Sequence, residues 1–184
     1  VHYVDTRDAA SYAGKRLFII GKQNSGFELA SGLLHWASRI VLASPRPALA
    51  EGQIDARIQA ALPALIATRR DIHRHPEVAG QETRTSALVA RQLRALGLQV
   101  RTGVGGHGVV AVLRGGKPGP VVGYRADMDA VPSRDPDPVD FRSIVTGVRH
   151  ICGHDVHTAV GLGVATALAS VKRDLPGTAV FYFQ

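Results

Sequence analysis

Residues 121–129 read VVGYRADMD, so that an apolar strand runs directly into two carboxylates, Asp127 and Asp129. The run is rich in β-branched and aromatic residues, and the acidic residues mark the point where the strand gives way to a loop. On both sides of this stretch, helical patterns alternate with strand patterns. This alternation predicts an α/β layer fold with a mixed or mostly parallel sheet, in which ligands bind beyond the carboxyl ends of strands.

Helices and further strands are expected around this central strand. Apolar residues at steps of three and four predict a helix from residue 53 to about 75, which Pro76 must end, and a second helix over 83–96. Residues 98–102, 108–114 and 178–183 read as strands, and 159–171 as a helix. Because the last strand closes the sequence, we expect it to present an exposed apolar edge and to favour aggregation.

The composition is that of a globular protein. Of 184 residues, 45% are hydrophobic and 20% charged, and no run approaches the roughly 18 apolar residues of a membrane helix. The net charge of +7 would suit an acidic partner. However, the basic residues are scattered and no aromatic residues alternate with them, which disfavours nucleic-acid binding. The single cysteine excludes an internal disulfide and favours the cytoplasm.

The strongest chemical signal is the segment 150–158, HICGHDVHT, which holds three imidazoles, one thiol and one carboxylate. Thiolate and imidazole are preferred donors for zinc and its neighbours in the transition series, so Cys152 and His154 are candidate metal ligands. The alternative is a small buried cysteine among ordinary histidines. Asp127 and Asp129 could ligate a metal or accept a hydrogen bond from a coordinated histidine, or they could serve only as turn residues.

Five motifs occur in the order that is typical of one family. They are DIHRHPE at 71–77, ET at 82–83, GVGG at 103–106, RADMDAVP at 125–132 and HICGHDVHT at 150–158. Together they resemble the metal-dependent amidohydrolases that include hippurate hydrolase, the indoleacetyl-amino-acid hydrolases and related aminoacylases or carboxypeptidases. The resemblance covers residues 53–184 and implies the N-terminal half of a three-layer catalytic domain, truncated at the C-terminus.

The resemblance implies an enzyme that cleaves the amide bond of N-acyl amino acids with two divalent metal ions, which could be Zn, Mn, Co or Ni. Cys152 and His154 match the metal ligands, and Asp129 matches the carboxylate that supports the catalytic site. Asp127 and His157 are further candidate ligands, whereas His73 and His75 of the first motif are expected to be structural. The implied partner is a small N-acyl amino acid or amide, and the full-length protein could be a homo-oligomer.

The same resemblance predicts that this chain is inactive. In the family, the general base is the first of two adjacent glutamates that follow a Phe-Gln pair at the end of a strand, and here the sequence stops at Phe183-Gln184. A non-catalytic metal-binding protein is therefore an alternative to the enzyme.

Residues 1–47 give a different signal, separated by a linker at 48–52 from the domain at 53–184. Residues 12–30 read YAGKRLFIIGKQNSGFELA and resemble the nucleotide-binding turn of flavin-dependent monooxygenases. Gly21 and Gly26 would make the turn at the start of a helix whose N-terminus could face a pyrophosphate. Gln23 replaces the middle glycine and would crowd a phosphate. A fragment of an FAD- or NAD(P)-dependent oxidoreductase is thus a further alternative, although one strand-helix-strand unit is too small to bind a dinucleotide.

Overall fold

The computed structural model describes residues 47–184, with side chains from residue 53 on. The predictions for residues 1–47, including the nucleotide-binding turn at Gly21 and Gly26, lie outside this range. The first described element is the long helix α2 (Pro47–Arg74). Residues 48–52, which were expected to form a linker, lie in the first turns of α2. Proline is compatible with such a start, since the first helical N–H has no partner within the helix.

Two further helices and six strands follow. The helices are α3 (Thr83–Ala95) and α4 (His154–Ser170). The strands are β1 (Gln99–Val104), β2 (Gly108–Arg114), β3 (Lys117–Ala126), β4 (Val131–Pro132), β5 (Val148–Arg149) and β6 (Pro176–Phe183). The predicted α/β fold is confirmed. The last helix begins at His154 rather than near residue 159, so the end of the HICGHDVHT motif is helical.

The main sheet has the strand order β1-β2-β6-β3 and is mixed. β1 pairs with β2 and β2 with β6 in antiparallel register, while β3 and β6 run parallel. The expectation of a mixed sheet is confirmed, but among the described strands the sheet is not mostly parallel. The expectation that residues 178–183 form an exposed edge is wrong, because β6 lies between β2 and β3 and is hydrogen-bonded on both sides.

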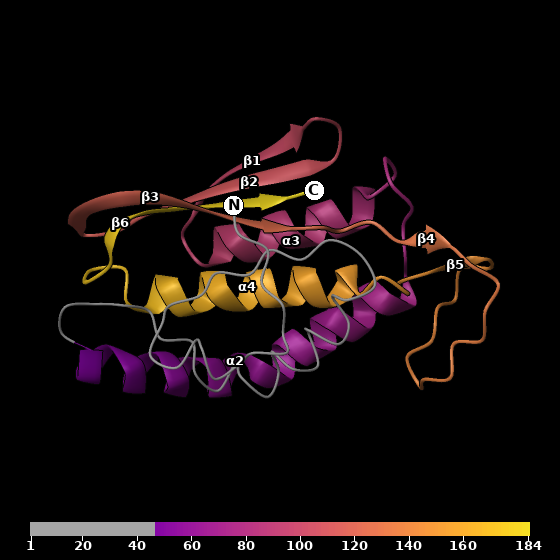
Figure 1. Cartoon of the computed structure of the whole chain (residues 1–184), viewed down its shortest axis with the longest axis horizontal. Coiled ribbons are helices and arrows are strands. Elements are labelled where there is room, and N and C mark those ends of the chain that lie inside the picture. Colours follow the sequence, from indigo (N-terminus) through magenta and orange to yellow (C-terminus); the bar gives the residue numbers. More distant parts are fainter. Residues whose placement is uncertain (1–46) are drawn as a thin grey trace, which may run out of the picture. The chain divides into compact units, whose positions relative to one another are not determined.

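The core lies between the sheet and the helices. Alternate residues of two central strands are buried on the helix side, namely Val109, Ala111, Leu113, Ala179, Phe181 and Phe183. In Figure 1, α3 and α4 lie beneath the sheet, and α2 lies beneath α4. Helix α4 approaches the sheet closely: a Cβ at Gly161 would lie 2.9 Å from the Phe183 ring. Val121 on the opposite face is 71% exposed, so the described helices cover one face of the sheet only.

This packing places the carboxyl end of β3 beside the start of α4. The two-stranded pair of β4 and β5 lies next to it and brackets the loop 133–147. None of the helices within residues 47–184 has the length and apolarity needed to cross a membrane.

Candidate metal centre

The backbone that follows β3 is fixed by hydrogen bonds on both sides. The N–H of Met128 donates to the carbonyl of Gln184 at 2.6 Å, and the N–H of Ala130 donates to the carbonyl of Glu77 at 2.7 Å. Met128 itself is fully buried. Successive side chains of an extended segment point to opposite sides, so burial of Met128 turns Asp127 and Asp129 away from the core. The two carboxylates are therefore held on a rigid strand end.

The start of α4 is fixed against this strand end. Gly153 precedes the helix in the left-handed region, with φ of 75°, a conformation that glycine adopts without steric cost. The hydroxyl of Thr158 donates to the carbonyl of Asp127 at 3.0 Å, which ties the first turns of α4 to β3. His154 and His157 are three residues apart and so share one face of the helix. That face points at the two carboxylates.

His154 is oriented by Asp129. Its Nδ1 lies 2.8 Å from the Asp129 carboxylate and 2.9 Å from the Asp129 carbonyl oxygen. A carbonyl can only accept a hydrogen bond, so Nδ1 carries a proton, and in the neutral imidazole Nε2 is then the nitrogen with the lone pair. This is the arrangement by which a carboxylate fixes the tautomer of a metal-binding histidine. His154 is therefore prepared to act as a ligand through Nε2.

Asp127 and His157 complete a group of three donors with His154. One donor atom from each residue lies within 4.8 Å of the others, and all three side chains are half-buried. His157 Nδ1 lies 3.6 Å from an oxygen of Asp127. The interaction with His157, followed by the Arg125 guanidinium, lowers the pKa of Asp127 to about 2 against the opposing effect of burial. Asp127 is thus an anion at neutral pH.

These residues fit a divalent transition-metal ion. One carboxylate and two imidazoles are a common ligand set for zinc and related metals, and the separation of their donor atoms is compatible with a single ion among them. The structure brings together three of the predicted site residues, Asp127, His154 and His157, and places Asp129 behind His154. Cys152 lies outside this group, on the exposed turn before α4. Its role as a ligand remains a prediction.

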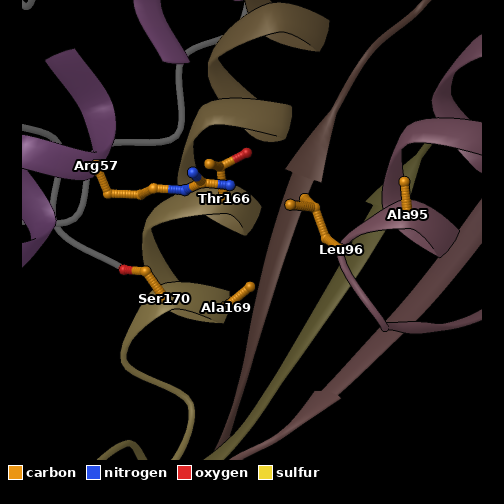
Figure 2. A pocket seen from close by; sticks show the side chains of 6 residues that line it. All are labelled: Arg57, Ala95, Leu96, Thr166, Ala169 and Ser170. Carbon is orange, nitrogen blue, oxygen red and sulfur yellow. The ribbon is translucent and has the colours of Figure 1, made fainter. Parts of the chain in front are cut away.

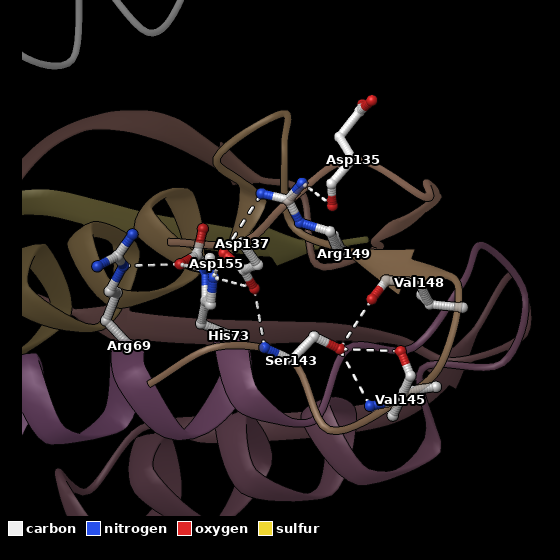
Figure 3. A network of polar contacts seen from close by, with 9 residues as sticks. All are labelled: Arg69, His73, Asp135, Asp137, Ser143, Val145, Val148, Arg149 and Asp155. Carbon is white, nitrogen blue, oxygen red and sulfur yellow. Dashed lines mark hydrogen bonds and ion pairs between the residues drawn. The ribbon is translucent and has the colours of Figure 1, made fainter. Parts of the chain in front are cut away.

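Asp155, the residue after His154 in α4, belongs to a second polar cluster, which Figure 3 shows. Asp155, which is fully buried, contacts His73 Nδ1 at 2.9 Å and Arg69 Nε at 2.7 Å. The other ring nitrogen of His73, Nε2, lies 3.3 Å from both oxygens of Asp137. Asp137 also contacts Arg149 at 3.3 Å and accepts the N–H of Ser143 at 2.8 Å. We call the five charged or ionisable residues Arg69, His73, Asp137, Arg149 and Asp155 the buried ionic network.

Contacts within the network shift the pKa values of His73, Asp137 and Asp155 toward their charged forms. The hydrogen bond to Asp155 is the main reason why the pKa of His73 is raised. Burial by itself would raise the pKa of Asp155, but the contacts with His73 and Arg69 more than offset it, and the net shift is downward. His150 beside the network behaves differently: burial lowers its pKa to about 4, so its ring is neutral. His73 is the cation between two anions.

A hollow in the surface lies far from this chemistry. A depression of about 370 Å³ is lined by Arg57, Ala95, Leu96, Thr166, Ala169 and Ser170 (Figure 2). Thr166 and Ser170 belong to the C-terminal end of α4, whereas His154 and His157 lie at its N-terminal end. This hollow therefore has no part in the metal centre.

Sequence reasoning did not identify the buried ionic network as a whole. His73 was expected to be structural, and Asp155 lies inside the HICGHDVHT motif, but no role was assigned to that carboxylate. Asp137 lies in a long loop with no regular pattern, so nothing in the sequence connects it with His73, which is 64 positions earlier.

Comparison with known proteins shows which family these residues resemble. Residues 123–184 match the model of peptidase family M20/M25/M40. The chain is 47% identical over 121 residues to thermostable carboxypeptidase 2 of Saccharolobus solfataricus, covering 65% of this chain and 31% of the relative. It is 41% identical over 120 residues to the N-acyl-L-amino acid amidohydrolase of Geobacillus stearothermophilus, covering 65% of this chain and 32% of the relative.

The solved structures agree. The Bacillus subtilis YXEP protein, described as a dinuclear metal-binding peptidase from the M20 family, superposes with a TM-score of 0.65 at 38% identity, over 68% of this chain and 35% of that one. The chain thus spans about a third of the length of the relatives that it matches. The predicted resemblance to metal-dependent amidohydrolases is confirmed: residues 123–184 match the model of peptidase family M20/M25/M40, and the described chain is similar in sequence and in fold to part of a solved M20 peptidase.

Proposed function

We propose that the protein is a metal-dependent amidohydrolase that cleaves the amide bond of N-acyl amino acids or related small amides, and that residues 127–158 provide part of its metal centre. The observation that carries this proposal is the pairing of His154 with Asp129 beside Asp127 and His157. The ring of His154 is held through Nδ1, which leaves Nε2 for a metal ion, and Asp127 and His157 offer two further donors next to it.

Divalent metal ions bound here would polarise the scissile carbonyl and make a water molecule acidic enough to act as nucleophile near neutral pH. The residues of this chain would hold and orient those ions. Asp127 would contribute negative charge next to the ions. Asp129 would not touch the ions, because its carboxylate holds the ring of His154 by a hydrogen bond. Asp129 therefore acts through His154 in this proposal.

The substrate class rests on relatives. One is named for N-acyl-L-amino acids, and the YXEP protein is described as binding two metal ions. We extend both properties to this protein, with Zn, Mn, Co or Ni as the metal. A small N-acylated substrate, a cytoplasmic location and the absence of nucleic-acid and membrane partners complete the proposal. The single cysteine supports the cytoplasmic location, and the scattered basic residues support the absence of a nucleic-acid partner.

Metal binding by the 184-residue chain is the direct test. Titration with Zn²⁺ or Co²⁺ is expected to show binding by the wild type and its loss in His154→Ala. His107→Ala is the matched control, since His107 lies in the turn between β1 and β2 and outside the donor group. Cys152→Ser tests whether the exposed thiol is also a ligand. Equal binding by His154→Ala and the wild type would refute the proposed centre.

Hydrolysis is a separate test. Within residues 53–184 the only glutamates are Glu77 and Glu82. The Glu77 carboxylate already accepts the N–H groups of Arg84 and Thr85, and Glu82 is buried. No glutamate of this range is therefore free to act as general base, and we expect no hydrolysis of N-acetyl amino acids by this chain. Hydrolysis that depends on added metal would contradict this expectation.

A further inference from the structure

We propose that His73 is a positioning residue of the metal centre, which holds the first turn of α4 at the strand end and connects it to the loop 133–147. This inference rests on the proposed function, because it concerns the affinity of the same centre for metal. It adds a residue on α2 that touches none of the candidate ligands.

The argument begins with the place of Asp155 on α4. Asp155 lies between His154 and His157 in the first turn, but its side chain points to the opposite side, into the core. There its Oδ2 is 2.9 Å from His73 Nδ1 and 2.7 Å from Arg69 Nε. Any rotation or shift of this turn that moves the two ligand histidines must also break or stretch these contacts.

The second step is the opposite edge of the His73 ring. Nε2 faces the Asp137 carboxylate at 3.3 Å, so both ring nitrogens donate to carboxylates. Asp137 in turn accepts the N–H of Ser143 and contacts Arg149 of β5. One imidazole ring therefore joins α2, α4 and the loop 133–147, as Figure 3 shows.

The loop is also attached to α2 by an aromatic contact. The ring of Phe141 packs edge-on against His73, with 5.1 Å between ring centroids. The guanidinium groups of Arg69 and Arg70 lie over the same ring, at 4.7 and 5.1 Å. His73 is thus enclosed on several sides and has little freedom to turn, which a positioning residue requires.

The His73→Gln and His73→Asn variants separate positioning from general stability. Glutamine places an amide near Nε2, so it can reach Asp137 but not Asp155. Asparagine places its amide near Nδ1 and can still reach Asp155. If His73 acts on the metal centre through Asp155, glutamine should weaken metal binding more than asparagine does. If His73 were only structural, both variants would lower the thermal midpoint of the metal-free chain. His73→Gln would then not weaken metal binding more than His73→Asn does.

The measurement is titration of the 184-residue chain with Co²⁺ alone, read by the visible absorption of the bound ion, together with thermal unfolding of the metal-free chain. We expect His73→Gln to raise the dissociation constant for Co²⁺ by about tenfold or more, which is typical of residues that support a ligand. His73→Asn should raise it less, and the absorption spectrum of bound Co²⁺ should change in His73→Gln.

The matched control is His75→Gln. His75 is the same residue type two positions further along, and its Nδ1 contacts only the carbonyl and carboxylate of Asp71 in the described structure. It should leave Co²⁺ affinity unchanged. Unchanged affinity in a folded His73→Gln chain would overturn the inference.

Two further outcomes are informative. If neither His73 variant folds, Asp137→Asn decides, because it weakens the same bridge at its loop end: weaker Co²⁺ binding supports the inference and unchanged binding overturns it. If the wild type binds no Co²⁺, the proposed metal centre itself fails, and the inference fails with it. Binding by the wild type with no change in the variants would remove only the role of His73.

Discussion

Two histidine–carboxylate pairs meet at the first turn of α4 and have opposite properties. In the pair His154–Asp129, only Nδ1 is engaged, and the half-buried ring has Nε2 available for a ligand. In the pair His73–Asp155, the contact distance is nearly the same, 2.9 against 2.8 Å, but Asp137 occupies the second nitrogen. A pair with one free nitrogen can bind a metal ion, whereas a ring between two carboxylates is a buried cation.

The difference shows that contact distance alone does not assign a role to a histidine. What matters is the partner of the second ring nitrogen and the burial of the carboxylate. Asp155 is fully buried, and removal of one member of a buried ion pair leaves the other uncompensated. Asp129 is partly exposed, so we expect it to orient the ring of His154 rather than to stabilise the fold. The two pairs should therefore respond to mutation in different measurements.

The largest expected effect is on stability, at Asp155. Asp155→Asn would leave Arg69 and His73 facing a neutral amide in the core, and we expect the free energy of unfolding to fall by about 3–5 kcal/mol. Denaturant unfolding of the metal-free chain measures this. Asp129→Asn should be much less destabilising in the same experiment. Equal losses in the free energy of unfolding would mean that Asp129 and Asp155 contribute equally to stability.

The next effect is on metal affinity, at Asp129. Asp129→Asn removes the anion that fixes the Nδ1 proton of His154, while the carbonyl of residue 129 still accepts that proton. We expect Co²⁺ binding to weaken by about 10- to 100-fold. Asp174→Asn is the matched control, because Asp174 is exposed and pairs with Lys117 at the other end of β3. Affinity within twofold of the wild type in Asp129→Asn would show that the carbonyl alone orients the ring.

The same contrast explains what the sequence could predict. The strand 108–114 and the helix 83–96 follow regular apolar periods and lie where they were expected. Asp127, His154 and His157 were recognisable because their residue types suit a metal and lie in short motifs. The start of α4 at His154 was missed, since Gly153 and two histidines do not look like a helix start. The link between His73 and Asp137 depends on tertiary packing across 64 positions, which no local pattern records.

The third prediction concerns the pH dependence of the contact between His73 and Asp137. The pKa of His73 is raised, so its contribution to stability is complete below the ordinary value of 6.5 and is lost as pH rises through the folded-state pKa. The pKa of Asp137 is lowered, so its contribution is present above 3.8 and is lost as pH falls through the folded-state pKa. The coupling between them should be largest between about pH 4 and 6.5.

A double-mutant cycle with His73→Asn and Asp137→Asn measures this coupling from the free energies of unfolding. We expect about 1–2 kcal/mol near pH 5.5 and a smaller value at high pH. Asp155 also contacts His73, Arg69 contacts the same oxygen of Asp155, and the His150 ring centroid lies 6.2 Å from that of His73, so the cycle is needed to isolate the contact with Asp137. A coupling that does not change with pH would show that the ring is not the cation described here.

The smallest expected effect is at Asp71, two positions before His73 on α2. Its carboxylate binds Arg84 at 2.6 and 2.8 Å, distances as short as those of the buried pairs, but the side chains are 37% and 41% exposed. Water and salt screen such a pair, so Asp71→Ala should cost only about 0.2–1 kcal/mol in the free energy of unfolding and leave Co²⁺ affinity unchanged. Because the contact is as short as that of Asp155, a loss as large as that of Asp155→Asn would mean that burial does not set the strength of these ion pairs.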